Sequence, residues 1–420
     1  MKQVCPDCGP ATVPHAFERW STAIDAAVTG IHQPFEWVYG LFAPAIAALR
    51  PGYLAGPIAA LCATLHLGVI VTAPDDKVNL RTQVLWEEAA RRGIVMKEFR
   101  PFDLARELFW ASYRSDVRAF DGLPRPRGAS SAALNWMDDK GIIIKKFRAA
   151  GIPVPRGRSC RTLAQAEQTF RGIGGPVIVK PNLGSRSRHT YVGIADPEAL
   201  RHAFGKAKEI SFSPVVEEEL SGFVFRITLI GGKVAGVMRR EPPHVTGDGR
   251  HTVRQLVEEE NKNPLRRGPI FHGISMDEAP ATLAAQGLTP DSVPAAGRMV
   301  VIHPKVSRSF GASTTEITDI HPDNGQLFAK IAETLNDPIV GVDFMIGDMA
   351  RSWKEQPKCG VIECNSLPFI DLHQYPLRGP SRNVAGAVWD MIFPGSNQGQ
   401  GQGRIKEEPL PAGMGRKRSG

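Results

Sequence analysis

Apolar positions recur along the chain at spacings that predict both helices and strands. Gly68–Thr72 is a short apolar run typical of a buried strand, Asn79–Arg92 carries its apolar residues on one helical stripe, and Ile94–Phe99 indicates a second strand. A strand, a helix and a strand in this order predict a β-α-β unit with a right-handed crossover, in a small open α/β domain.

The segment before this unit is unusually apolar. Phe35–Ala73 is rich in Ala, Leu and Ile, but Arg50-Pro51-Gly52 and Gly56-Pro57 interrupt it. Because a membrane-spanning helix needs about 20 uninterrupted apolar residues, these breaks favour packed core helices and make a membrane unlikely. The alternative is a hairpin that faces a membrane surface or a partner.

The pattern predicts four parts. They are an N-terminal helical, apolar segment (1–66), a small α/β domain (67–128), a large domain (129–395) and a disordered tail (396–420). The Pro and Gly cluster Asp121–Gly128 marks the linker between the second and third parts, and the tail is a Gly, Gln and Pro stretch that ends in basic residues.

In the third part, charged residues stand at the ends of apolar strands. The run Gly175–Lys180 ends in a lysine, which is costly to bury unless it meets an anion or an acceptor. The loop that follows, Asn182–His189, offers backbone amides, two arginines and a histidine, which suit a polyphosphate. A strand in Pro214–Gly222 and a glycine-turn hairpin in Phe225–Arg240 come next. Each piece alone is equally compatible with an antiparallel sheet carrying solvated charges.

Three oxygen-bearing side chains lie on two later apolar runs. Asp343 is in Gly341–Phe344, and Glu363 and Asn365 are in Val361–Asn365, where strand alternation directs them to one face. The polar segment between the runs predicts a hairpin that brings Asp343 beside the other two. Such donors suit Mg²⁺, although exposed acids on a strand pair are also common without a metal.

The order of these motifs resembles the ATP-grasp ligases, in particular the ATP-grasp portion of cyanophycin synthetases and of fused bacterial glutathione synthetases. The resemblance covers about Asn135–Pro394, and its main segments are Asp139-Lys140, Val179-Lys180-Pro181, Val216-Glu217 with Gly222 and Arg226, Arg240–Thr252, Gly341-Val342-Asp343 and Ile362–Asn365. It implies an α/β (α+β) ATP-grasp fold, in which two α/β subdomains clamp ATP, preceded by a small open α/β domain.

The resemblance also implies roles for individual residues. Lys140 and Lys180 would contact ATP, with Ser185 in the phosphate loop and Glu217, Glu219 and Leu220 forming the adenine strand. Asp343, Glu363 and Asn365 would hold Mg²⁺ (or Mn²⁺), and Arg226 and Arg240 would be catalytic, facing the transferred phosphoryl group. A cross-strand salt bridge is the alternative for the two arginines. On the acceptor side, we expect His373, Arg378 and Arg382 to line the pocket and bind a carboxylate of the substrate.

The implied activity is ATP- and Mg²⁺-dependent ligation of a carboxylate to an amine through an acyl phosphate, joining amino acids or short peptides. Two departures keep alternatives open: the phosphate loop Asn182–Thr190 retains only Gly184, and Val224 stands where an acid usually binds ribose. These alternatives are a non-catalytic ATP-binding regulator, or pseudo-ligase, and a phosphotransferase that stops at the phosphorylated acid.

Composition narrows the partners and the compartment. The net charge of +8 lies partly in the phosphate loop and the tail, and no aromatic-interleaved basic run is present, so anionic small molecules are expected rather than nucleic acid. A homo-oligomer stays open. Six scattered cysteines and the absence of a signal-peptide layout favour the cytoplasm. Cys5-Pro-Asp-Cys8 resembles half a zinc knuckle that His15 alone does not complete, and a frayed terminus is the alternative.

Overall fold

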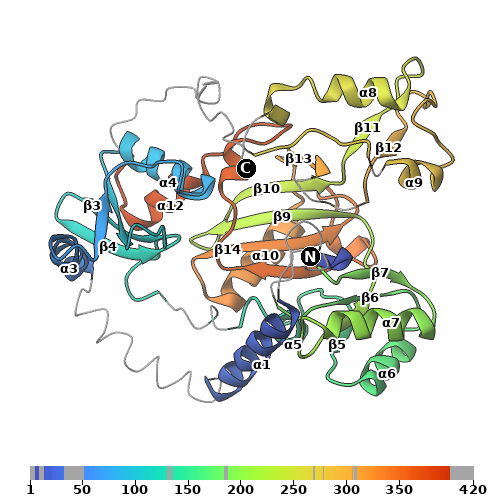
Figure 1. Ribbon diagram of the computed structural model, residues 1–420, viewed down its shortest axis with the longest axis horizontal. Coiled ribbons are helices and arrows are strands. Elements are labelled where there is room, and N and C mark those ends of the chain that lie inside the picture. The colour runs from blue at the N-terminus through green and yellow to red at the C-terminus, as the bar shows by residue number, and fades with distance from the viewer. Residues whose placement is uncertain are drawn as a thin grey trace.

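The computed structural model describes residues 5–8, 14–32, 52–129, 133, 136–183, 188–267, 270–277, 279–304, 306 and 310–397. Within these ranges the chain forms three principal β-sheets with helices packed on them, and a smaller two-stranded sheet (Figure 1). None of the helices described is both long enough and apolar enough to cross a membrane.

The first sheet has four antiparallel strands in sequence order. They are β1 (Gly68–Val71), β2 (Val95–Pro101), β3 (Leu108–Tyr113) and β4 (Asp116–Asp121), with helix α4 (Leu80–Arg91) between β1 and β2. Both predicted strands and the predicted helix are confirmed, and Asn79 caps the helix by accepting a hydrogen bond from the Thr82 amide at 3.0 Å.

The predicted right-handed β-α-β crossover is wrong, because β1 and β2 are antiparallel neighbours, with Gly68 opposite Pro101. Eight residues separate β1 from α4, whereas only three separate α4 from β2. At about 3.3 Å per residue, the longer connection can return the chain to the starting end of the four-residue strand β1 before the helix begins. The short turn then sends β2 back alongside β1 in the opposite direction.

Helix α3 (Gly52–Thr64) lies on the outside of this sheet, against β3 and β4. Its outer side carries Ile58, Leu61 and, just beyond the helix, Leu65, whose exposed fractions are 57%, 60% and 58%. The expectation of a packed core helix therefore does not hold for this side of α3. The helix packs on the sheet with its inner side only, and no other described element covers its outer side. The other predicted apolar residues, 35–51, lie outside the described ranges.

The second sheet contains the lysine-terminated strand. Its order is β5 (Gly157–Ser159), β8 (Val215–Glu218), β6 (Val177–Lys180) and β7 (Tyr191–Ile194), and all its pairs are antiparallel. Helices α6 (Leu163–Ile173) and α7 (Pro197–Lys208) cover one face. They bury Val177 and Val179 completely in a shared core. The charged residues Lys180 and Glu217 stand near the C-terminal ends of β6 and β8.

The third sheet is the scaffold of the predicted metal strands. Its order is β13 (Ser313–Glu316), β10 (Lys233–Glu241), β9 (Phe223–Ile230), β14 (Ile339–Ile346) and β15 (Gly360–Asn365). Both predicted hairpins, β9–β10 and β14–β15, are confirmed. Alternate residues pack against helices α5 (Lys140–Ala149) and α10 (Pro322–Leu335), among them Phe225, Val342 and Phe344. The residues between them face the opposite side, so side-chain alternation separates core from site.

A short hinge joins the second sheet to the third. The chain leaves β8 at Glu218 and enters β9 at Phe223, passing through Gly222 with φ +117°. A Cβ at Gly222 would lie 2.4 Å from the carbonyl carbon of Ile346, so only glycine fits there. The Ser221 amide also donates to the Lys358 carbonyl at 3.0 Å, which fastens the hinge to the third sheet.

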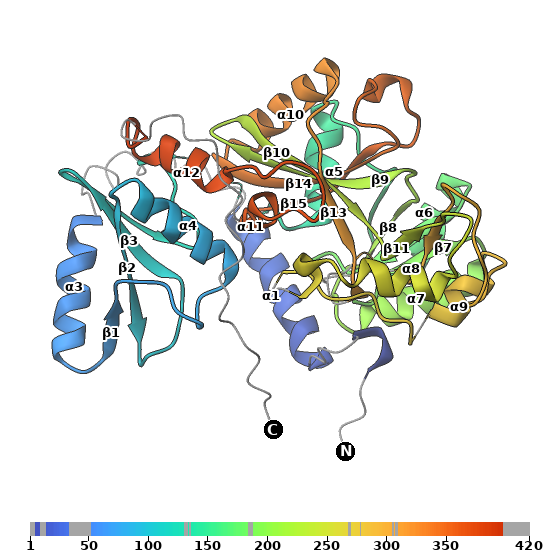
Figure 2. The ribbon, with the colours of Figure 1, turned by 90° about the horizontal axis from the view of Figure 1, so that it is seen from above.

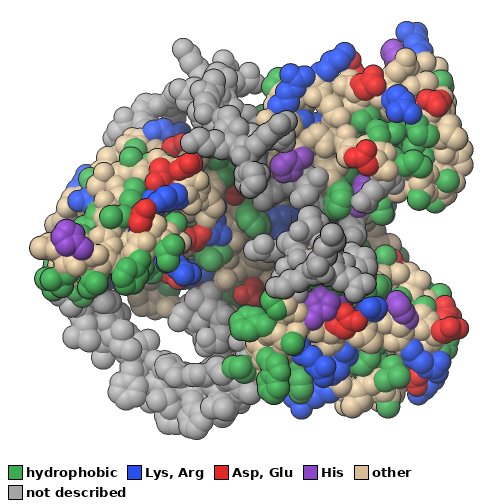
Figure 3. Space-filling view, viewed as in Figure 1, with side chains coloured by type: hydrophobic (Ala, Val, Ile, Leu, Met, Phe, Trp, Pro, Cys, Tyr) green, Lys and Arg blue, Asp and Glu red, His purple; other side chains and the backbone are tan. Residues whose placement is uncertain are grey.

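An insertion between β10 and β13 forms a separate small lobe that the sequence pattern did not reveal. It contains β11 (His244–Thr246), β12 (Met299–Val301), α8 (Val253–Glu260), the 3-10 turn η4 (Pro264–Arg267) and α9 (Ala279–Ala284), and it has its own apolar core. The space-filling view shows a hollow between this lobe and the lobe that carries α6 and α7 (Figure 3).

The remaining elements link distant parts of the chain. Helix α12 (Val384–Ile392) packs against α4, and the Trp389 indole donates to the Leu85 carbonyl at 2.9 Å (Figures 1 and 2). The small domain and the end of the large one thus share a core. The four-part division stays a prediction. The other helical pieces are η1 (Pro6–Cys8), α1 (His15–His32), η6 (Trp353–Glu355) and α11 (Asp371–Gln374).

Candidate active site

Three charged residues form a row across the third sheet. Asp343 on β14 lies directly opposite Glu363 on β15 and, on its other side, opposite Arg226 on β9. Residues paired across neighbouring strands direct their side chains to the same face. The predicted meeting of Asp343 and Glu363 on one face is therefore present, and Arg226 joins them.

Asp343 is enclosed by cations. Both of its carboxylate oxygens accept hydrogen bonds from Arg226, one of them from Nη2 at 2.8 Å, and Arg240 Nη1 is 3.6 Å away. Burial acts to raise the pKa of Asp343, but the charge and hydrogen bonds of Arg226 outweigh it, so the pKa is lowered from its ordinary value. The salt bridge considered for the two arginines is present, and it leaves them beside the predicted metal ligands.

Lys140 approaches this row from the first turn of α5. Its ammonium lies 3.8 Å from a Glu363 oxygen and 3.5 Å from the Asn182 carbonyl, and the residue is only 5% exposed. Asp139 caps the helix, accepting from the Ile142 amide, and the Asn182 side chain also donates to Asp139 at 2.6 Å. The start of α5 is thereby fastened to the loop that follows β6, which fixes where Lys140 points.

Lys180 connects the second sheet to the third. Its ammonium contacts Glu217 on β8 at 2.5 Å and the Ile362 carbonyl on β15 at 3.4 Å. The buried lysine at the end of β6 therefore has the anionic partner that the sequence analysis required. Glu217 is only 2% exposed, and its carboxylate forms an ion pair with Lys180.

The rest of the predicted adenine strand lies in the hinge. Glu219 accepts a hydrogen bond from the Gly193 amide at 3.2 Å through its side chain, and Leu220 is 7% exposed. Ser185 lies outside the described residues. The hinge follows β8 directly, so its backbone groups begin two residues after Glu217, the partner of Lys180.

The donor set of the predicted magnesium site fits a hard cation. Asp343, Glu363 and Asn365 offer oxygens, and the Asn365 amide nitrogen is buried with no described residue accepting from it. Since rotation about the last side-chain bond exchanges the amide oxygen and nitrogen, this orphaned end can present an oxygen to a metal. Both carboxylates already pair with cations. Mg²⁺ would therefore have to displace Arg226 and Lys140 or share the carboxylates with them.

Asp138, another carboxylate near this site, was missed in the sequence. Its residue is partly exposed, but desolvation of the carboxyl group first, and then the charge of Glu363, raise the pKa of Asp138 above its ordinary value. The same surroundings raise the pKa of Cys364 well above its ordinary value, mainly through burial, and so keep its thiol protonated. The run Asp138-Asp139-Lys140 was the available signal for Asp138, but adjacent acids at a helix start are also ordinary capping residues.

Two of the three predicted substrate residues, His373 and Arg382, lie beside Glu316, a carboxylate that the sequence analysis did not single out, whereas Arg378 contacts another acid. His373 is fully buried, with Nδ1 2.8 Å from Glu316 and Nε2 2.8 Å from the Thr228 hydroxyl. Its ring nitrogens thus already contact protein groups. Arg382 Nε lies 3.9 Å from Glu316 and its side chain is 43% exposed, so it can reach a ligand. Arg378 contacts Glu260 at 3.3 Å and lines a pocket of about 520 Å³ on the inserted lobe.

Comparisons with known proteins agree with the motif pattern. No protein-family model matches the chain. It is 30% identical over 332 residues to a cyanophycin synthetase of Nostoc sp., covering 78% of this chain and 36% of that protein. It is also 30% identical over 329 residues to the bifunctional glutathione biosynthesis protein of Clostridium perfringens, covering 76% and 41% of the two chains.

The same likeness appears in three dimensions. The crystal structure of a bifunctional glutathione synthetase from Pasteurella multocida superimposes with a TM-score of 0.58 at 26% identity, covering 75% of this chain and 44% of that one. The chain therefore spans less than half the length of these relatives. The predicted α/β fold and the resemblance to these ATP-grasp ligases are confirmed.

Proposed function

We propose, on the premise of this shared fold and sequence, that the chain is an ATP- and Mg²⁺-dependent carboxylate–amine ligase. Its substrates would be amino acids or short peptides, and it would act in the cytoplasm, where ATP and free amino acids are available. The observation that carries the proposal is the convergence of Lys140, Glu363, Asp343, Arg226 and Arg240 on one face of the third sheet, next to the end of β6.

A carboxylate resists attack by an amine because it is negatively charged and offers no good leaving group. Transfer of the terminal phosphoryl group of ATP to the carboxylate gives an acyl phosphate and releases ADP. The amine then attacks the carbonyl carbon of the acyl phosphate, which forms an amide and releases phosphate and the proton that the nitrogen loses. The protein must align the two reactants and neutralise charge, and it needs no nucleophilic side chain. The protonated thiol of Cys364 is consistent with that.

The charged row supplies both requirements. Lys140 from α5 and Lys180 from the second sheet bring positive charge toward β15, where phosphates would lie. Arg226 and Arg240 are held beside Asp343 and would stabilise negative charge as the phosphoryl group moves. Mg²⁺, when bound to Asp343, Glu363 and Asn365, would neutralise phosphate oxygens and fix their orientation.

The test is incubation of the full chain with ATP, Mg²⁺, pooled amino acids and hydroxylamine. Hydroxylamine traps an activated carboxylate as a hydroxamate, so the expected products are a hydroxamate, which identifies the acid, and ADP. A Glu363→Gln variant prepared identically controls for contaminating enzymes. ATP binding without ADP release from any mixture would instead indicate the regulator. A phosphorylated acid that yields no amide with any amine would indicate the phosphotransferase.

A further inference from the structure

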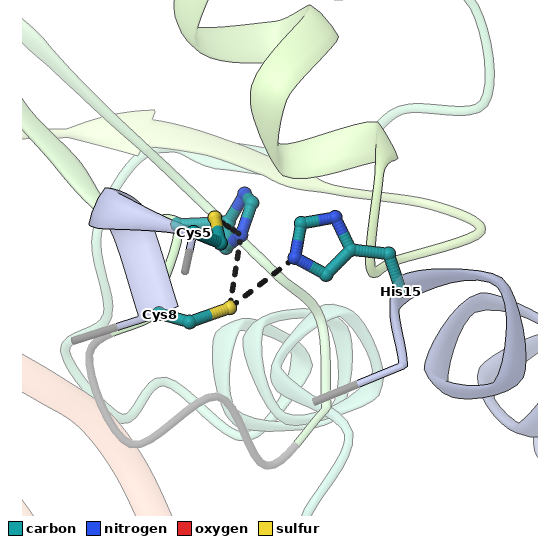
Figure 4. Close-up of side chains that lie close together, drawn as sticks. Cys5, Cys8 and His15 are labelled. Carbon is teal, nitrogen blue, oxygen red and sulfur yellow. Dashed lines mark hydrogen bonds between the residues drawn. The ribbon is translucent and has the colours of Figure 1, made fainter. Parts of the chain in front are cut away.

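We propose that Cys5, Cys8, His15 and His189 form a structural zinc site, separate from the ATP site. The four ligand atoms all lie within 4.8 Å of one another, and Cys8 and His189 are buried. The first three residues belong to the N-terminal segment, as Figure 4 shows. The fourth comes from the end of the loop after β6, more than 170 residues later in the sequence.

The three sulfur–nitrogen contacts have the spacing of ligands on one tetrahedral ion. His189 Nε2 lies 3.6 Å from Cys5 Sγ and 3.5 Å from Cys8 Sγ, and His15 Nε2 lies 3.3 Å from Cys8 Sγ. With Zn–S bonds of about 2.3 Å and Zn–N bonds of about 2.0–2.1 Å, tetrahedral geometry separates sulfur from nitrogen by about 3.6 Å. The two rings cross nearly edge to face, at 82° with their centres 4.9 Å apart, so that each directs Nε2 inward.

The second ring nitrogens have the partners that metal-bound histidines use. His189 Nδ1 is 2.8 Å from the Lys206 carbonyl, and His15 Nδ1 is 3.1 Å from the Glu209 carboxylate. Both acceptors come from the last turn of α7 and the residue after it. A proton on each Nδ1 leaves the lone pair of each Nε2 directed toward the sulfurs, which is the tautomer that a metal requires.

Hydrogen bonding alone satisfies this cluster less well than a cation does. Three sulfur–nitrogen contacts converge, but two thiols carry only two protons between them. Neither cysteine is in a disulfide. Two thiolates and two neutral imidazoles around Zn²⁺ have zero net charge, which suits a buried site.

The donor chemistry selects zinc among the metals. Two thiolates and two imidazoles in a tetrahedron are typical of Zn²⁺ or of iron–sulfur centres. In a two-iron cluster with mixed ligands, however, the cysteines and histidines bind different irons, so sulfur and nitrogen would not share edges of one tetrahedron. Four protein ligands also leave no open position for a substrate, which makes the site structural rather than catalytic.

The ion would fasten the N-terminal segment to the second sheet. Other contacts follow the same path: the His189 amide donates to the Asp7 carbonyl at 3.2 Å, Arg188 lies 3.7 Å from Glu18, and the Phe212 amide donates to the Thr22 hydroxyl at 3.1 Å. These contacts fasten α1 to the loop before β7 and to the loop after α7, and the metal would close the link at its start.

The experiment measures metal content in the full chain, expressed with zinc and purified without chelators, in the absence of ATP or substrate. Elemental analysis should find one zinc ion per chain, and replacement by Co²⁺ should give the visible absorption of tetrahedral cobalt with thiolate ligands. Cys8→Ser and His189→Gln should lose both signals. Cys62→Ser and Cys359→Ser, which change half-buried cysteines outside the cluster, should keep them.

A milder variant guards against misfolding of the ligand variants. Glu209→Ala removes the partner of His15 Nδ1, together with a part-exposed ion pair to Lys206, and should weaken zinc binding about 10–100-fold. The proposal is overturned if the wild-type chain holds neither zinc nor Co²⁺, if Cys5 and Cys8 are recovered as a disulfide, or if Cys62→Ser loses as much metal as Cys8→Ser. Because no outcome depends on ligase activity, failure of the proposed function would leave this result unaffected.

Discussion

Replacing Glu363 with glutamine should nearly abolish ligation while leaving the fold intact. Glu363 pairs with Lys140 at 3.8 Å, and its side chain is 37% exposed. A partly exposed ion pair at that distance contributes about 1 kcal/mol or less to stability. Lys140 would also keep the nearby charges of Asp138 and Asp343, so it would not be left as an isolated buried cation.

The expected effect on catalysis is much larger. A group that stabilises charge only as the reaction proceeds is worth about 10²–10³-fold in kcat, or about 2.7–4 kcal/mol. Glutamine keeps the shape and one oxygen but loses the negative charge that would hold Mg²⁺. We therefore expect kcat to fall at least about 100-fold while the free energy of unfolding changes by about 1 kcal/mol or less.

The assay pairs hydroxamate formation with urea unfolding of the same preparations. Glu167→Gln is the matched control, because Glu167 lies on α6 and pairs with Arg201 at 2.9 Å, away from the charged row. Activity of Glu363→Gln within a few-fold of wild type would refute the metal-ligand role. A loss of activity that merely follows a loss of stability would refute the separation of the two effects.

Three further predictions test other parts of the molecule. Asp138→Asn should stabilise the metal-free protein at neutral pH, because desolvation raises the pKa of Asp138 and its ionised form therefore disfavours folding. In unfolding measured against pH, the gain in stability should disappear below the ordinary carboxyl pKa of 3.8. A gain that persists at lower pH would contradict this cause. Gly222→Ala should destabilise by about 1–3 kcal/mol in urea unfolding, because φ is +117° and a Cβ would meet Ile346, whereas Gly172→Ala on open α6 should not destabilise; equal stability of the two variants would contradict the hinge argument. Arg382→Ala should raise KM for one substrate but not for ATP, and unchanged KM values for all substrates would remove Arg382 from the pocket.

Local patterns in the sequence predicted the strands and their pairing well. The β14–β15 hairpin was accessible because alternation fixes which side chains share a face, and the polar segment between the two apolar runs indicates that the strands are neighbours. The same holds for α5, whose cap Asp139 and first residue Lys140 stand together in the sequence. Such features depend on residues close to one another along the chain.

Features that depend on distant residues were missed. The direction of β2 relative to β1 depends on how the connection to α4 runs, which alternation does not encode. Glu316 meets His373 from 57 residues away, and nothing in its own segment marks it as a site residue. His189 completes the cysteine and histidine cluster from more than 170 residues away, and in the sequence it seemed to belong only to the phosphate loop.

The double position of His189 relates the two sites. It closes the segment Asn182–His189, whose first residue is fastened to Lys140 and Asp139. The last residue of the segment, His189, contacts the Lys206 carbonyl, the Asp7 carbonyl and the sulfurs of Cys5 and Cys8. Anchoring both ends of a segment reduces the number of positions that it can sample. If this segment contacts the phosphates as proposed, these fixed ends would reduce the ordering required when ATP binds.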